Sequence, residues 1–173
     1  PILDMNFSKK LIQRGWPIAA TLALNVVYFR ADSFIVAYFK GVSDAGIYNI
    51  AYSVFQSALV LPAFIMNAYY PMMLRSLKGI RFVGLSLFLM AGFGTILTLS
   101  LAPFVIKILT GSGFAGSSSA LRILSLGFPA YFLSALMMWI MIARGRYKIL
   151  LFIYFIGFLV NLFLNFMFIP RYS

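Results

Sequence analysis

The sequence predicts an all-α membrane protein, built as a bundle of five antiparallel transmembrane helices. Of its 173 residues, 63% are hydrophobic and only 10% are charged, whereas a soluble domain is about half apolar and about a quarter charged. A soluble fold of this length could not bury so much apolar surface, so the excess must face lipid.

Five apolar runs carry this prediction, because each is long enough to cross a hydrocarbon core, which needs about 20 residues. The connections between the runs are short, which implies that successive helices run antiparallel. A polar lead-in over residues 1–14 precedes the first run and is assigned to the cytoplasm. The predicted helices span residues 15–39, 44–71, 82–103, 118–143 and 149–169.

Prolines, glycines and serines add detail to these helices. Pro62 and Pro129 lie inside predicted helices, where the missing backbone N–H predicts a kink. The glycine-containing segment 107–117 is expected to form an irregular external loop. One serine of the run 117–119 is expected to cap the following helix by accepting a hydrogen bond from its free backbone donors.

The basic residues are distributed asymmetrically over the predicted connections. The net charge of +11 results from 14 basic and three acidic residues. Cytoplasmic loops carry the excess of Lys and Arg. We therefore predict a multi-pass protein of the cytoplasmic membrane with a cytoplasmic N-terminal end, and the charge needs no nucleic-acid partner. Nine basic residues fall on the N-terminal side, four on the other, and Arg30 inside the first helix; the nine are Lys9, Lys10, Arg14, Arg75, Lys78, Arg81, Arg144, Arg146 and Lys148.

The residue types that catalysis and metal binding need are scarce. Cysteine and histidine are absent, which removes thiolate and imidazole ligands and the commonest general base. The three acids, Asp4, Asp32 and Asp44, are scattered and form no carboxylate pair. No glycine-rich phosphate loop is present. The sequence therefore predicts a protein that is not an enzyme and that uses no cofactor or metal.

Arg30 and Asp32 are the only charged residues well inside a predicted helix. Such a charge is costly, by about 2.5 to 3.5 kcal/mol on insertion scales, and it usually marks function. The two residues are two positions apart, so they do not face each other and do not form a simple local ion pair. Asp32 continues a polar stripe at helical spacing with Thr21, Asn25 and Tyr28. This stripe is expected to face a cavity or a neighbouring helix.

The second predicted helix returns polar side chains to about the same depth. We expect Arg30 to face the interior of the bundle, with Tyr52, Ser53 or Gln56 within hydrogen-bonding range. Two roles for these polar groups remain open: they line a hydrated cavity, or they tie helices together. Asn161 and Asn165 lie one turn apart on the fifth predicted helix, and interhelical hydrogen bonding is their expected role.

Two regions of the chain, one near its start and one near its end, resemble the second half of polysaccharide flippases. Arg30-Ala31-Asp32 and then residues 39–52 (FKGVSDAGIYNIAY) match that family's R-x-D helix and its short turn into the next helix. Residues 143–148 (ARGRYK) look like its basic turn. Residues 161–165 (NLFLN) and 169–172 (IPRY) look like the helix and exit that follow.

The resemblance implies a place in the multidrug/oligosaccharidyl-lipid/polysaccharide exporter superfamily. Its members have two six-helix bundles around a central cationic cavity and work by alternating access. The resemblance implies that these helices are the seventh to eleventh of at least twelve, that the chain is incomplete at both ends, and that an N-terminal bundle is missing. The implied function is to flip undecaprenyl-pyrophosphate-linked oligosaccharide across the bilayer.

On the same resemblance, Arg30 contacts the pyrophosphate or an acidic sugar, and Asp32 orients Arg30 or couples an ion. Asn25, Tyr28, Tyr52 and Gln56 complete the expected substrate-binding set. A multidrug or cation antiporter of the same superfamily is one alternative, in which Asp32 is the essential charge. A membrane scaffold subunit that transports nothing is another.

Overall fold

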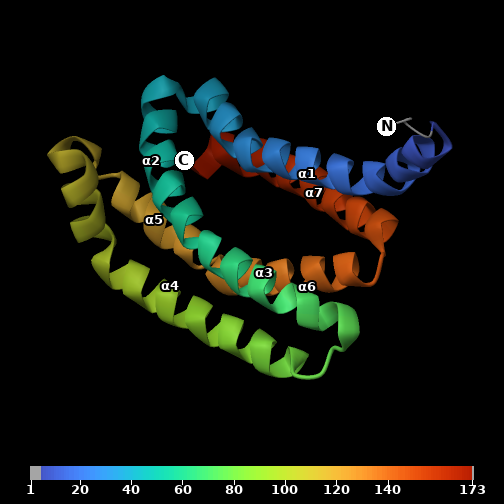
Figure 1. The fold of residues 1–173 in the computed structure, drawn as a ribbon. Coiled ribbons are helices and arrows are strands. Elements are labelled where there is room, and N and C mark those ends of the chain that lie inside the picture. Colours follow the sequence, from blue (N-terminus) through green and yellow to red (C-terminus); the bar gives the residue numbers. More distant parts are fainter. Residues whose placement is uncertain (1–4, 173) are drawn as a thin grey trace.

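The computed structural model describes residues 5–172, and every regular element within them is a helix (Figure 1). The predicted all-α fold class is therefore confirmed. The helices are α1 (Met5–Lys40), α2 (Val42–Ala58), α3 (Val60–Arg75), α4 (Ile80–Thr110), the short 3₁₀ helix η1 (Gly111–Phe114), α5 (Ser117–Ser125), α6 (Phe128–Ala143) and α7 (Tyr147–Tyr172).

The candidate membrane spans agree in number with the prediction once a bent pair is counted as one. Helices α5 and α6 pass a length and hydropathy test only together, with a bend of 50° between them. The predicted lead-in is helical from Met5 onward, but the apolar part of α1 begins at Gly15 as expected. The other four candidate spans are Gly15–Lys40, Val42–Arg75, Ile80–Thr110 and Tyr147–Arg171.

The helices form a bundle with two opposite sides and two segments between them (Figure 1). Helix α1 lies alongside α7 on one side of the bundle, and α4 lies on the opposite side. The segments α2–α3 and α5–α6 run between these two sides. The start of α1, the α3–α4 connection and the α6–α7 turn all lie at the same end, so the segments with most of the basic residues are grouped together.

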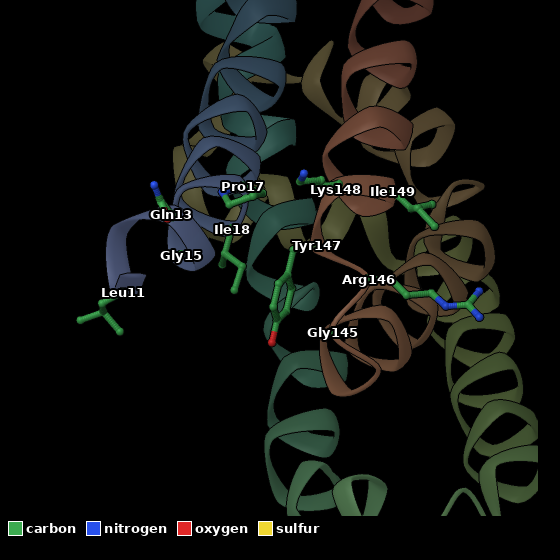
Figure 2. A pocket seen from close by; sticks show the side chains of 10 residues that line it. All are labelled: Leu11, Gln13, Gly15, Pro17, Ile18, Gly145, Arg146, Tyr147, Lys148 and Ile149. Atoms are coloured by element: carbon green, nitrogen blue, oxygen red, sulfur yellow. The ribbon is translucent and has the colours of Figure 1, made fainter. Parts of the chain in front are cut away.

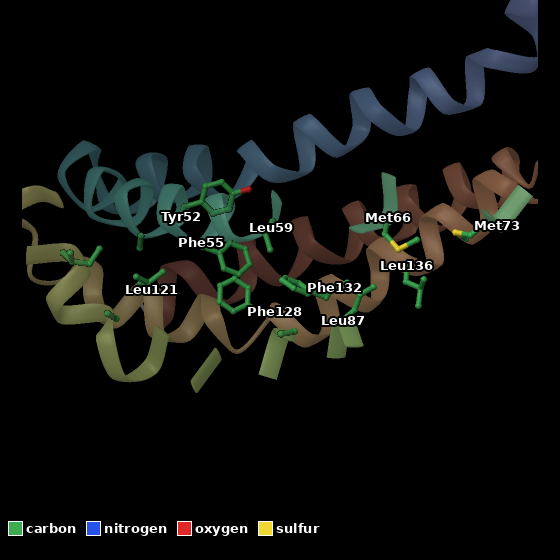
Figure 3. Packing of buried hydrophobic residues seen from close by; sticks show 14 residues of the cluster. Tyr52, Phe55, Leu59, Met66, Met73, Leu87, Leu121, Phe128, Phe132 and Leu136 are labelled. Carbon is green, nitrogen blue, oxygen red and sulfur yellow. The ribbon is translucent and has the colours of Figure 1, made fainter. Parts of the chain in front are cut away.

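The apolar core lies between α2–α3, α4 and α5–α6 (Figure 3). Phe55 and Phe128 stack at its centre with ring centroids 5.0 Å apart and ring planes at 12°. Leu87 and Met66 are fully buried beside them. Ala91 on α4 is fully buried as well, and such small residues let neighbouring helices approach closely in a membrane.

Two of the predicted helices are broken, each beside a proline. Helix α2 gives way to α3 at Leu59, and Pro62 follows in the first turn of α3. Helix α5 gives way to α6 at residues 126–127, and Pro129 follows in the first turn of α6. Proline fits these positions because first-turn N–H groups have no intrahelical acceptor. The kink expected at Pro129 is thus present as the 50° bend between α5 and α6, whereas α2 and α3 form one candidate span without a comparable bend at Pro62.

Helix α4 continues beyond Pro103, where the sequence predicted its end. A proline inside a helix leaves the carbonyl four residues earlier without its helical donor. Here that carbonyl belongs to Leu99, and the Arg122 Nε on α5 donates to it at 2.9 Å. The predicted end at residue 103 is therefore wrong by seven residues, because a side chain from another helix replaces the missing donor.

The same exchange occurs in the opposite direction at Pro129. Helix α5 ends at Ser125 and Pro129 has no N–H to offer, so the Ser125 carbonyl needs another donor, and Thr95 Oγ1 on α4 donates to that oxygen at 2.9 Å. The Thr95 hydroxyl also lies 3.0 Å from the Ala91 carbonyl oxygen of its own helix. Helices α4 and α5 therefore each supply a donor to a carbonyl that a proline has freed in the other.

The expected serine cap is not formed. Helix α5 begins at Ser117 with no side-chain cap. The Ser117 hydroxyl instead donates to the Ile47 carbonyl on α2 at 2.7 Å, and the Ser118 hydroxyl donates to the Ala115 carbonyl at 2.7 Å. The predicted irregular loop is also shorter than expected, because α4 extends to Thr110 and η1 follows at once. These serines join helices and turns rather than capping one.

We predict that Thr95→Val destabilises the fold by about 1 kcal/mol, within the range measured for interhelical hydrogen bonds in membranes. The change keeps the shape of the side chain but leaves the Ser125 carbonyl without its donor. Unfolding in mixed detergent micelles, followed by circular dichroism, measures the difference. Thr98→Val is the matched control, since it makes the same change on the same helix. Equal stability of the two variants would contradict this role for Thr95.

Candidate functional site

Asp32 joins three helices through its two carboxylate oxygens. Asn165 Nδ2 on α7 donates to Oδ1 at 2.6 Å, and the Tyr48 hydroxyl on α2 donates to Oδ2 at 3.3 Å. Asn165 Nδ2 also donates to Asn161 Oδ1 at 3.1 Å. Hydrogen bonds to a charged acceptor are about twice as strong as neutral ones. Asp32 is therefore the point at which α1, α2 and α7 are held together.

The predicted polar stripe on α1 faces α7. Asn25 hydrogen-bonds to the hydroxyl of Tyr154 on α7, in line with the Asp32–Asn165 bond two turns away. Tyr28 is half-buried and meets Phe29 edge to face, with ring centroids 5.5 Å apart. Thr21 is buried and donates to the Pro17 carbonyl of its own helix at 2.7 Å. The expectation of a neighbouring helix is confirmed, and that neighbour is chiefly α7.

Tyr52 lies in an aromatic wall beside this carboxylate. Its ring stacks on Tyr48 with centroids 5.9 Å apart and lies 6.3 Å from Phe29. Only 4% of Tyr52 is exposed, and its hydroxyl has no hydrogen-bond partner in the described part of the chain. Figure 3 shows this hydroxyl directed toward α1. A buried hydroxyl without a partner is costly, by about 1 to 3 kcal/mol, and so indicates a site where another group can bind.

Arg30 is exposed, so the expectation that it faces the interior of the bundle with a hydrogen bond from Tyr52, Ser53 or Gln56 is wrong. Within residues 5–172, Arg30 has no hydrogen bond and no ion pair, and Asp32 is bonded to other groups. The side chain is thus an accessible cation two positions before the hydrogen-bonded Asp32 on the same helix.

Gln56 and Ser53 do not join this cluster. Both are exposed on α2, and the Ser53 hydroxyl donates to the Asn49 carbonyl of its own helix at 2.8 Å. The structure therefore joins Asp32 and Tyr52 through Tyr48, places Asn25 and Tyr28 on the stripe, and leaves Arg30 exposed and Gln56 apart. Sequence reasoning overlooked Tyr48 as a partner of Asp32, although Tyr48 stands in the quoted motif.

The fifth predicted helix supplied more of the site than the sequence indicated. Asn165 was expected to form interhelical bonds, and its bond to Asp32 confirms that role. Two asparagines one turn apart in an otherwise apolar helix were the available signal. The described residues contain no group of three His, Cys, Asp or Glu side chains that could hold a metal ion.

The comparisons with known proteins concern the first part of the chain. Residues 2–77 match the model of a family described as "Polysaccharide biosynthesis protein". This segment, less than half of the chain, is similar to that family. The search of curated proteins and the search of solved structures returned no match.

The matched segment contains α1, α2 and α3, and with them Arg30, Asp32, Tyr48 and Tyr52. The partner of Asp32 on α7 lies beyond the match, at Asn165. The candidate site is therefore built mainly within the matched segment and completed by the last described helix.

We predict that Asn165→Ala destabilises the fold by about 1 to 2 kcal/mol, because the Asp32 carboxylate loses a charge-assisted donor inside the bundle. Reversible unfolding in detergent measures this loss. Asn67→Ala, at an exposed position of α3, is the matched control and should change little.

A double-mutant cycle with Asp32→Ala tests the pair itself. Once Asp32 is removed, Asn165→Ala should cost much less than it does alone. Strictly additive losses would show that the two side chains act independently.

Proposed function

We propose that this chain is half of a membrane transporter that flips lipid-linked oligosaccharide across the cytoplasmic membrane for polysaccharide biosynthesis. The family match of residues 2–77 and the multi-pass helical fold support this proposal. The proposed substrate is an undecaprenyl-pyrophosphate-linked oligosaccharide, and the proposed partner is an N-terminal helical bundle outside this sequence. The role is that of a transporter and not of an enzyme.

The single observation that carries the proposal is the exposed Arg30 guanidinium in a membrane-crossing helix. A cation there is costly unless an anion or water binds it. A pyrophosphate offers oxygens that match the paired N–H donors of Arg. An anionic lipid headgroup on Arg30 therefore satisfies a cation that the described residues leave without a hydrogen bond or ion pair.

Asp32 has a positioning role in this proposal. Its bonds to Tyr48 and Asn165 fix α1 against α2 and α7, and so they fix the direction in which Arg30 projects. The breaks at Leu59 and at residues 126–127 are places where helix segments can change their angle. Alternating access requires such points, because packed helices move as rigid pieces about a few hinge residues.

The proposed orientation places the N-terminal end in the cytoplasm, since most basic residues lie at that end of the bundle (Figure 1). We predict that a cysteine at Gly113 reacts with a membrane-impermeant thiol reagent in intact cells. A cysteine at Ser76 should react only after the cells are opened. Both positions are exposed, and a side chain at Gly113 meets no atom within 4 Å. The reverse labelling pattern would overturn the orientation.

We predict that Arg30→Ala reduces polysaccharide display more than about tenfold at normal expression, because the headgroup loses its charge-assisted donors. Arg30→Lys should retain part of the activity, since it keeps the charge but not the paired donors. Surface polysaccharide in a complemented deletion strain is the measurement. Lys107→Ala is the matched control, because it removes an exposed cation in the last turn of α4. Normal display with Arg30→Ala would reject the proposal.

A multidrug or cation antiporter is the second candidate, and the half-buried Asp32 carboxylate favours it. In that case Asp32 holds the cation, and removing the nearby Arg30 charge relieves repulsion. Asp32→Asn should then abolish drug resistance, while Arg30→Ala should preserve or raise it. Resistance and polysaccharide display measured in the same strains separate the two functions. A scaffold that transports nothing predicts that neither substitution changes either readout at normal expression.

A further inference from the structure

Two adjoining cavities lie where the start of the apolar part of α1 meets the first turns of α7. The larger is an open pocket of about 720 Å³ between Gly15 and Pro17 on one side and Tyr147 and Lys148 on the other (Figure 2). The smaller, of about 440 Å³, is lined by Trp16, Lys148, Leu151, Phe152 and Phe155. Lys148 lines both, so the two cavities meet at its side chain.

The larger pocket is basic. Figure 2 shows the Lys148 side chain reaching toward α1, whereas the Arg146 guanidinium points away from α1. Neither cation has an ion-pair partner in the described part of the chain. Asp32 lies 17 residues farther along α1 than Gly15, which is about 25 Å at the helical rise. A negative group entering this pocket therefore meets a positive charge and no nearby carboxylate among residues 5–172.

The smaller cavity is apolar and follows α7 into the membrane. Trp16, Phe152 and Phe155 are exposed beside Lys148. Phe155 lies seven positions after Lys148, which is about 10 Å along the helix axis. Trp16 and Tyr147 stand at the level where α1 and α7 become apolar, which is the usual depth of aromatic residues at a membrane surface. The basic pocket thus lies at headgroup depth and the apolar groove at acyl-chain depth.

We propose that this double cavity binds an anionic phospholipid, with its phosphate on Lys148 and one acyl chain in the groove between Trp16 and Phe155. Basic pockets between helices on the positively charged side of membrane proteins bind such headgroups. A zwitterionic phospholipid offers the same chain but a net neutral headgroup, and so gains less from Lys148. The site lies at the basic end of the bundle and does not include Arg30.

Trp16 fluorescence tests the proposal directly, because bromine atoms on a neighbouring acyl chain quench it. The full protein is prepared with Trp16 as its only tryptophan; here Trp139→Phe keeps an aromatic ring against Tyr70, which lies 5.0 Å away. It is placed in phosphatidylcholine vesicles that contain a minor fraction of lipid brominated near the carboxyl end of the chain. Brominated phosphatidylglycerol should reach half-quenching at about fivefold lower content than brominated phosphatidylcholine, the preference that one lysine supplies.

The variants locate the charge. Lys148→Gln should abolish the preference for phosphatidylglycerol, and Lys148→Arg should keep it. The matched control is Lys107→Gln, at an exposed lysine in the last turn of α4, and it should leave the preference intact. Retained quenching by both lipids shows that Lys148→Gln still folds, so a loss of preference is not a loss of structure. Equal quenching by the two lipids before mutation would overturn the proposal. An unchanged preference in Lys148→Gln would also overturn it. So would an absence of quenching by either lipid, which is the result expected if another protein segment covers the groove.

Discussion

The bundle depends on one constraint: in a medium without water, each backbone carbonyl that loses its helical donor must find another. Pro103 and Pro129 each create such a carbonyl, and the donors come from opposite helices. Arg122 on α5 serves Leu99 on α4, and Thr95 on α4 serves Ser125 on α5. The bent pair α5–α6 keeps its 50° angle against α4 under this reciprocal arrangement. The Phe55–Phe128 stack then packs against the bend.

The other side of the bundle obeys the same constraint with a charge in place of a carbonyl. The Asp32 carboxylate is compatible with a membrane-crossing helix because Asn165 and Tyr48 donate to it from two directions. No comparable partner serves Arg30 among the described residues. Asp32 therefore holds the fold together, whereas Arg30, only two positions away, is left to bind another group. The proposed transport role rests on that difference.

The sequence predicted the number, order and approximate position of the membrane spans, because apolar length is a local property. It failed where a partner decides the outcome. The sequence predicted a helix end at Pro103, but α4 continues past it, and Arg122 donates to the Leu99 carbonyl from 23 residues away in sequence. The site shows the same limit. Polarity indicates that Asp32 must be satisfied, but it cannot name Asn165 as the donor, and it wrongly paired Arg30 with α2.

The distance of 133 residues between Asp32 and Asn165 also has a consequence for biogenesis. A ribosome adds about 5 to 20 residues each second, so α1 waits on the order of ten seconds for the asparagine that satisfies its carboxylate. The apolar part of α1 has a mean hydropathy of 1.3, against 2.3 for α7. Of the two spans, α1 is therefore the less suited to lipid during this wait. Of these two helices, the one made earlier therefore depends on the one made later. During synthesis α1 requires water, an insertase or a chaperone beside it until α7 arrives.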